Sequence, residues 1–198
     1  MKKTNIFWER SLITRQDREI KNGHRSFVLW FTGLPSSGKS TIAHNVEKSL
    51  FELGCHTYVF DGDNIRHGLC KDLGFSSSDR SENIRRIAEV IKLFIDAGII
   101  CLSAFVSPTR KDRENARKII GNKDFIEIYV KCSIEVCENR DKKGLYKKAK
   151  AGLIPNYTGV NGLYEEPLSP DLILETDKYS IEQCKEKVIN FVKQLINL

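Results

Sequence analysis

Signal peptides, membrane spans and metal-binding cysteine pairs are all missing from this 198-residue sequence. Residues 1–6 carry no apolar core of the kind that a secretory signal needs, and no apolar run approaches the length that crosses a membrane. The six cysteines are scattered without a C-x-x-C pair, which argues against both a cysteine metal site and a disulfide framework. These absences predict a reduced, cytoplasmic protein with no membrane partner.

Aromatic residues are not interleaved with basic ones, as a surface that binds single-stranded nucleic acid would require. The formal net charge of +6 suits nucleic acid and small anionic substrates equally well. We therefore predict small anionic substrates and no nucleic acid.

The sequence also has no internal repeat and no low-complexity segment, and its length suits one domain that buries about 70% of its unfolded surface. We predict a single domain over residues 1–198. Residues 141–170, called the lid segment here, are rich in lysine and contain glycines; a loop of this length is typical of a lid, with a solvated basic surface as the alternative. Residues 1–26 form a polar extension that we expect to pack on the body or on a second subunit. Its apolar residues are Ile6, Phe7, Trp8, Leu12 and Ile13.

The most informative motif follows an apolar run at residues 27–31, which predicts a buried strand. The run leads into Gly33-x-x-x-x-Gly38-Lys39-Ser40, the pattern of a phosphate-binding loop, and the next apolar residues recur at helical spacing. Glycine lets the backbone wrap a phosphate so that several N–H groups point at it. Lys39 supplies a cation for the β- and γ-phosphates, and Ser40 supplies a hydroxyl ligand for Mg²⁺.

A Gly/Ser turn could match this pattern by chance, but the order of strand, loop and helix argues against it. We predict an α/β fold of the P-loop NTPase type, a three-layer sandwich with a mostly parallel central sheet and helices on both faces. The further strands are expected at residues 55–60, 99–106, 125–131 and 172–174, with helices at 84–95, 112–120, 135–140 and 181–195. The predicted ATP-binding residues of the phosphate loop are Gly33, Leu34, Pro35, Ser36, Ser37, Gly38, Lys39, Ser40 and Thr41.

Two acidic residues, Asp61 and Asp63, follow the second predicted strand directly. In open α/β sheets the ligand site lies beyond the carboxyl ends of the strands, which is where this pair is expected. Carboxylates beside a triphosphate suit Mg²⁺, held by Ser40 and Asp61, or a general base. An Asp-Gly turn with an Asx cap is the alternative.

Residues 74–83 predict a loop that leads to a helix cap and carries an exposed aromatic, Phe75. An anion-binding role is better motivated for Arg80, which precedes the predicted helix in this loop, than for Arg85 and Arg86. A solvated basic face would explain that pair.

With these motifs placed, residues 8 to about 167 resemble the adenylylsulfate kinase family, whose members phosphorylate adenosine 5′-phosphosulfate (APS) at the 3′-hydroxyl with ATP. The phosphate loop is shared with many unrelated proteins. The motifs at residues 61–69, 75–86 and 143–146, in this order and spacing, are specific to the family. The resemblance also suggests a homodimer.

The resemblance implies a role for each matching residue. Asp63 acts as the base or metal-linked carboxylate at the acceptor hydroxyl, and Ser107 matches a serine described as a phosphorylated intermediate. The remaining implied contacts are Arg66, Arg80 and Asn83 on the phosphosulfate, Phe75 on its adenine, Arg140 over the ATP adenine, and Lys143 to both substrates. The lid segment departs from the family pattern at three positions. They are Lys150 for an arginine, Tyr157 for a phenylalanine that stacks on the acceptor adenine, and Leu163 for a proline.

Three other functions match parts of the sequence less well. A GTPase is disfavoured because Asp141-x-x-Gly144 and the near match at residues 122–125 come in the wrong order. A kinase for another small acceptor, such as a nucleotide or shikimate, is opposed only by Arg66, Phe75 and Arg80. A non-catalytic nucleotide-binding protein would be expected to lack Lys39 or Asp63, and both are present.

The sequence predicts that Lys39→Ala lowers kcat by a factor on the order of a hundred or more, because the charge that stabilises the transition state is removed. ADP release by purified protein measures this, with circular dichroism to check folding. Near-normal turnover in the folded variant would mean that this loop is not the catalytic cradle.

Overall fold

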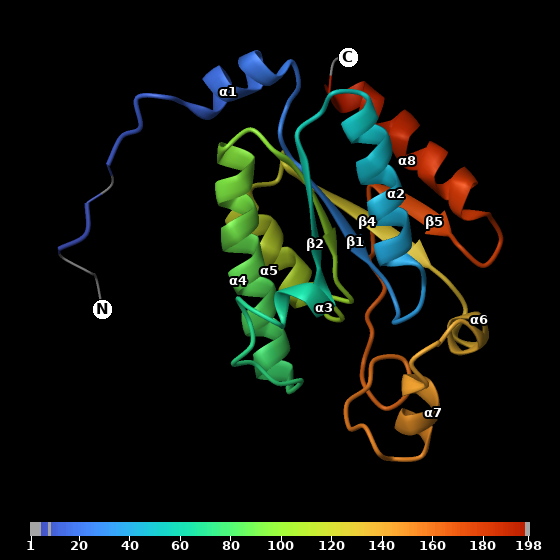
Figure 1. Cartoon of the computed structure of the whole chain (residues 1–198). Helices are drawn as coiled ribbons and strands as arrows, with labels where there is room; N and C mark the ends of the chain where they lie inside the picture. Colours follow the sequence, from blue (N-terminus) through green and yellow to red (C-terminus); the bar gives the residue numbers. More distant parts are fainter. Residues whose placement is uncertain (1–4, 8, 197–198) are drawn as a thin grey trace.

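The computed structural model describes residues 5–7 and 9–196. Trp8, counted above among the apolar residues of the extension, lies outside the described residues. A twisted sheet forms the centre of the molecule, and helices cover both of its faces (Figure 1).

The central sheet has five parallel strands in the order β2-β3-β1-β4-β5. This confirms the predicted fold class, and the sheet, expected to be mostly parallel, is parallel throughout. The carboxyl ends of all the strands therefore meet at one edge, toward the bottom of Figure 1. The strands are β1 (Val28–Thr32), β2 (Thr57–Asp61), β3 (Ile100–Ala104), β4 (Phe125–Lys131) and β5 (Leu172–Glu175), each close to a predicted position.

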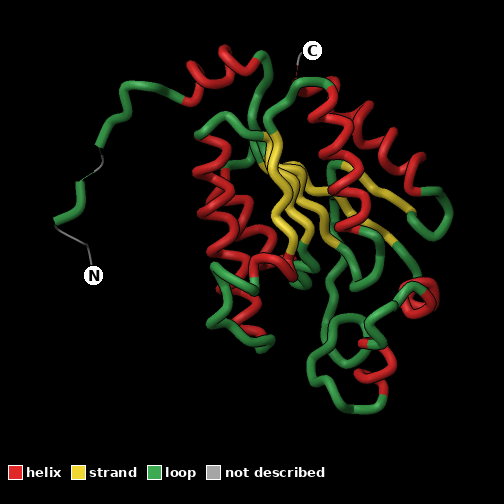
Figure 2. The backbone as a smooth tube through the Cα atoms, in the orientation of Figure 1, coloured by secondary structure: helices red, strands yellow, loops and turns green. Residues whose placement is uncertain are grey.

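The helices form the two outer layers (Figures 1 and 2). α2 and α8 cover one face of the sheet, α4 and α5 cover the other, and α3, α6 and α7 lie beyond the carboxyl edge. Their bounds are α1 (Arg15–Asn22), α2 (Lys39–Glu52), α3 (Gly62–Ile65), α4 (Ser77–Asp96), α5 (Arg110–Ile120), α6 (Ile134–Asn139), α7 (Leu145–Lys150) and α8 (Ile181–Ile196). Within the described residues, none of these helices is both long and apolar enough to cross a membrane.

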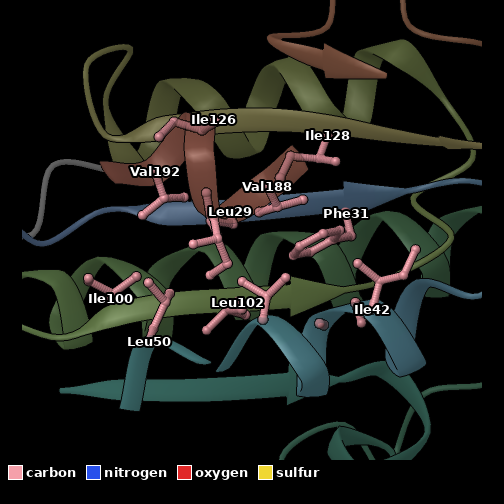
Figure 3. Packing of buried hydrophobic residues seen from close by; sticks show 14 of the residues in the cluster. Leu29, Phe31, Ile42, Leu50, Ile100, Leu102, Ile126, Ile128, Val188 and Val192 are labelled. Atoms are coloured by element: carbon pink, nitrogen blue, oxygen red, sulfur yellow. The ribbon is translucent and has the colours of Figure 1, made fainter. Parts of the chain in front are cut away.

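Strand β1 is buried on both sides because it lies in the middle of the sheet. Successive side chains of a strand point to opposite faces. Leu29 and Phe31 therefore join the cluster under α2 and α8, and Trp30 joins the cluster under α4 and α5. Figure 3 shows the first cluster, with Val188 of α8 among the β1 side chains.

Helix α4 begins earlier than predicted. The Ser76 hydroxyl accepts a hydrogen bond from the backbone N–H of Asp79 and donates one to the side-chain carboxylate of Asp79. The helix therefore starts at Ser77. Arg80 therefore lies in the first turn of α4, not in the loop before it. The expectation that Arg80 precedes the helix is wrong, because this capping pair sets the boundary.

Among the described residues, the N-terminal extension packs on the body through α1 and through residues 24–26, which follow it. Arg15 forms a double contact with Asp124, at 2.5 and 2.9 Å, and Asn22 donates to the carbonyl of Gly98. Before α1 the apolar side chains are open to solvent, from 55% exposed at Ile13 to 96% at Leu12. The expected packing on the body is thus found from α1 onward and not for Ile6, Phe7, Leu12 and Ile13.

Candidate active site

The phosphate loop joins β1 to α2 at the carboxyl edge of the sheet. A Cβ atom at Gly33 would lie 2.4 Å from the carbonyl oxygen of Val130, closer than any real side chain can approach. Gly38 opens α2 with a φ of 99°, in the region that favours glycine. The two glycines of the motif are thus needed for two different reasons, a close approach and a left-handed backbone.

Lys39 is folded back onto the loop that carries it. Its ammonium donates to the carbonyl oxygens of Gly33 at 3.0 Å and of Leu34 at 2.6 Å, and the side chain is almost fully buried. Burial lowers the pKa of Lys39 to about 8, although the nearby acids Asp61 and Asp63 act in the opposite direction. A phosphate entering the loop would offer this cation a better partner than two carbonyl dipoles.

The predicted metal and base residues come together beside Lys39. The Ser40 hydroxyl donates to Oδ2 of Asp61 at 2.6 Å, and Oδ1 of the same carboxylate accepts the N–H of Asp63. A hydroxyl and a carboxylate at this separation are the hard oxygen ligands that Mg²⁺ takes together with phosphate oxygens and water, so the residues fit the ion. The described residues contain no cluster of three or more acidic, histidine or cysteine side chains that would hold a metal alone.

Asp63 is paired with the lid segment. Its Oδ2 accepts a hydrogen bond from Lys143 at 2.5 Å, and this carboxylate raises the pKa of the Lys143 ammonium. Both side chains are largely exposed, so the pair is open to competition from water and ligands. The structure therefore brings Lys143 of the lid segment and Asp63 of the sheet edge to one point.

The predicted acceptor residues gather around Phe75, which is 61% exposed. The guanidinium carbons of Arg66 and Arg80 lie 4.5 and 5.5 Å from the centre of its ring. Arg80 also donates to the carbonyl of Asn156 in the lid segment, and burial together with the charge of Arg66 lowers its pKa. Asn83, one turn further along α4, is 3% exposed, and its amide nitrogen meets no hydrogen-bond partner in the described chain.

Ser107 follows β3 in a left-handed backbone conformation with a φ of 38°. Its hydroxyl is buried and accepts a hydrogen bond from the indole N–H of Trp30 at 3.1 Å. The sequence placed Ser107 at the strand end but did not reveal Trp30, because the contact joins two strands that are far apart in the chain.

The lid segment rests on the phosphate loop through tyrosine. The hydroxyl of Tyr146 donates to the carbonyl of Pro35, and the ring of Tyr157 packs edge-on against Tyr146 with centroids 5.1 Å apart. Tyr157, expected beside the acceptor adenine, is thus buried in the base of the lid in this structure. Among the departures from the family pattern, Lys150 pairs with Glu138 at 2.6 Å, and Leu163 is exposed.

Arg140, expected over the ATP adenine, ends α6 and donates to the backbone carbonyl of Thr176 at 2.7 Å. The hydroxyl of Thr176 in turn donates to the carbonyl of Ser37 in the phosphate loop. No motif pointed to Thr176, which follows the last strand by one residue.

A phosphate loop at the carboxyl edge of a parallel sheet, with carboxylates beside it and a basic segment folded over it, is the arrangement of the P-loop kinases. This chain is a kinase of that class. The adenylylsulphate kinase family matches residues 25–175, and the chain belongs to this family. The resemblance drawn from the sequence motifs is confirmed.

Named relatives agree with this assignment. The adenylyl-sulfate kinase of Acaryochloris marina is 58% identical over 98% of this chain and 95% of its own length. That of Thermodesulfovibrio yellowstonii is 54% identical over the full length of both chains. The APS kinase of Mycobacterium tuberculosis, solved with AMPPNP and APS, is 45% identical, with a TM-score of 0.82 over 85% of this chain and 98% of that one.

The buried ammonium of Lys39 predicts that nucleotide binding depends on pH. Below about pH 8 the free protein already carries the charge; above it, binding must take up a proton, since the phosphates raise the pKa of Lys39 again. The Kd for ATP should therefore rise above pH 8, by up to about tenfold per pH unit. Calorimetry in two buffers of different ionisation enthalpy measures the proton uptake. In Lys39→Arg, which stays charged, the uptake should disappear; equal uptake in both proteins would contradict the assignment.

Proposed function

We propose that this kinase transfers the γ-phosphoryl group of ATP to the 3′-hydroxyl of APS, giving 3′-phosphoadenosine 5′-phosphosulfate and ADP. The observation that carries the proposal is the arrangement around Phe75, an exposed aromatic ring with two arginines over it. One of these, Arg80, shares helix α4 with Asn83, whose buried amide nitrogen meets no partner among the described residues. Such an arrangement suits a planar base that carries a strongly anionic group.

On the ATP side, the residues of the phosphate loop would wrap the triphosphate, from Gly33 to Thr41. Lys39 would leave the two carbonyls that it now contacts and bind the β- and γ-phosphates. Ser40 and Asp61 would hold Mg²⁺, which supplies charge neutralisation between the phosphates. Arg140 would lie over the ATP adenine after releasing Thr176.

On the acceptor side, Phe75 would stack on the adenine, and Arg66, Arg80 and Asn83 would hold the phosphosulfate. Both arginines now bond to backbone carbonyls, of Gly74 and of Asn156, which an anionic ligand can replace with a gain in electrostatic energy. Tyr157 would reach the acceptor adenine only if the base of the lid rearranges, since its ring now packs on Tyr146.

Asp63 would accept the proton of the 3′-hydroxyl as it attacks. Asp63 and Lys143 are both largely exposed, so the acceptor hydroxyl would have room to enter beside the Asp63 carboxylate. Lys143 would then be free to reach the phosphates of both substrates. This route needs no covalent intermediate on the protein.

We further propose that the protein is cytoplasmic and forms a homodimer. The exposed apolar side chains before α1, such as Phe7 and Leu12, support a second subunit as their cover. Analytical ultracentrifugation of the full chain tests the dimer.

A screen of acceptors tests the proposed reaction. Purified protein with Mg²⁺ and ATP is offered APS, AMP, shikimate or water, and ADP release is followed. We expect release with APS alone. The Arg80→Ala variant should lose about 2–5 kcal/mol of APS affinity, the effect of truncating one partner of a desolvated charge pair, with ATP affinity retained. Faster turnover with another acceptor would replace the proposed substrate.

Direct transfer from ATP to the 3′-hydroxyl predicts that substitutions at Asp63 and Ser107 lower the activity to different extents. Ser107→Ala should lose only the roughly 1 kcal/mol of a neutral hydrogen bond, because the Ser107 hydroxyl is already engaged by Trp30. Asp63→Ala should lower kcat by on the order of 10²–10⁴. A chiral γ-phosphate should be transferred with inversion. Retention of configuration, or a kinetically competent phosphoserine, would favour a covalent route through Ser107.

A further inference from the structure

The lid segment returns to the body of the protein through a buried cluster that the proposed reaction does not use. Arg113 of α5 is 3% exposed and contacts three separate parts of the chain. It donates to the carbonyl of Ser107 at 2.6 Å and to the carbonyl of Glu165 at 2.6 Å, and its Nε pairs with Glu127 of β4 at 2.7 Å. A buried arginine that touches three parts of the chain limits how far those parts can move relative to one another.

Tyr164, the residue before Glu165, reaches the end of β1 directly before the phosphate loop. The hydroxyl of Tyr164 lies 3.1 Å from Oγ1 of Thr32, the last residue of β1. Since the Thr32 hydroxyl donates to the carbonyl of Val106 at 2.8 Å, the Tyr164 hydroxyl is the donor in this contact. The ring of Tyr164 is held between Arg113, 5.8 Å from its centre, and the stacked ring of Tyr129.

We propose that Arg113, Tyr164 and Thr32, called the hinge cluster here, form the fixed C-terminal hinge of the lid and couple the lid to the occupancy of the phosphate loop. Arg113 and Tyr164 are positioning residues in this proposal, since neither lies at the reacting atoms. The inference rests on the proposed function only for the identity of the acceptor.

The coupling follows from what Lys39 must do. Its ammonium leaves the carbonyl of Gly33 when a triphosphate binds, so the peptide between Gly33 and Leu34 loses a cationic partner. The Tyr164 hydroxyl is bonded to the side chain of Thr32, the residue directly before Gly33. A change in the loop therefore reaches the lid through one hydrogen bond, while Arg113 keeps the end of the lid in place.

The test uses variants that remove one hydroxyl each, because truncating Arg113 would leave Glu127 buried without its partner and could prevent folding. Tyr164→Phe and Thr32→Val each remove one of the two hydroxyls that form the contact between Tyr164 and Thr32, with little change in side-chain shape. Tyr129→Phe is the matched control: it removes the hydroxyl of the tyrosine that stacks on Tyr164 and leaves the contact between Tyr164 and Thr32 in place.

We expect Tyr164→Phe and Thr32→Val each to lower kcat about fivefold, the change that the loss of one neutral hydrogen bond gives. The double variant should lose no more than Thr32→Val alone, and not the product of the two losses, because Thr32→Val already breaks the contact with Tyr164 together with its bond to Val106. Thermal unfolding should shift by only a few degrees. A double variant whose loss equals the product of the two single losses, or single variants with wild-type kcat, would overturn the proposal.

A second readout does not depend on the acceptor. Trypsin cleavage at the lysines of the lid segment is followed with and without AMPPNP and Mg²⁺. The wild type and Tyr129→Phe should be protected by the nucleotide, whereas Tyr164→Phe should be cleaved equally in both conditions although it still binds AMPPNP in calorimetry. Protection of Tyr164→Phe, or no protection of the wild type, would overturn the coupling. An acceptor other than APS would overturn the proposed function and leave this result unaffected.

Discussion

The site depends on how closely β1 and β4 approach each other at Gly33. No side chain fits between this residue and the carbonyl of Val130, so the backbone of the phosphate loop starts from one fixed point at the carboxyl edge of the sheet. Other parts of the site are fastened to this loop. Tyr146 of the lid segment bonds to the loop at Pro35, and Thr176 beyond the last strand bonds to it at Ser37. The buried sheet thus supplies a rigid base from which flexible polar side chains work.

Positive charge is the second constraint, since the site brings the cations Lys39, Lys143 and Arg80 together. Each cation donates to an acceptor of the protein itself: Lys39 to carbonyls of the phosphate loop, Lys143 to Asp63, and Arg80 to the carbonyl of Asn156. Each of these contacts is weaker than a contact with phosphate or sulfate, so anionic ligands can displace them in turn. The lid segment takes part in two of these contacts, through the ammonium of Lys143 and the carbonyl of Asn156.

Several features were predictable because they depend on local pattern or on chemistry that few residues can perform. Strand β4 has the predicted bounds, because a buried apolar run between turn residues has few alternatives. The phosphate loop and the Asp61 pair were placed correctly at the edge of the sheet. The start of α4 was missed although Ser76 and Asp79 carry a capping signal, because Gly74 and the serines also suggest a loop. The position of Tyr157 was not predictable, since its packing partner Tyr146 belongs to another turn of the lid.

By itself, the sequence determined the class of fold, the family and the chemical types at the site, because hydrophobic period, glycine placement and motif spacing are properties of the chain. Tertiary structure alone decided which polar groups meet. Trp30 with Ser107, Arg113 with Glu165, and Tyr164 with Thr32 join residues that lie between 52 and 132 positions apart. Such contacts depend on the twist of the sheet and on the path of the lid back across it. A buried hydrogen bond requires alignment to within a few tenths of an ångström, and only the packed core fixes its partners so closely.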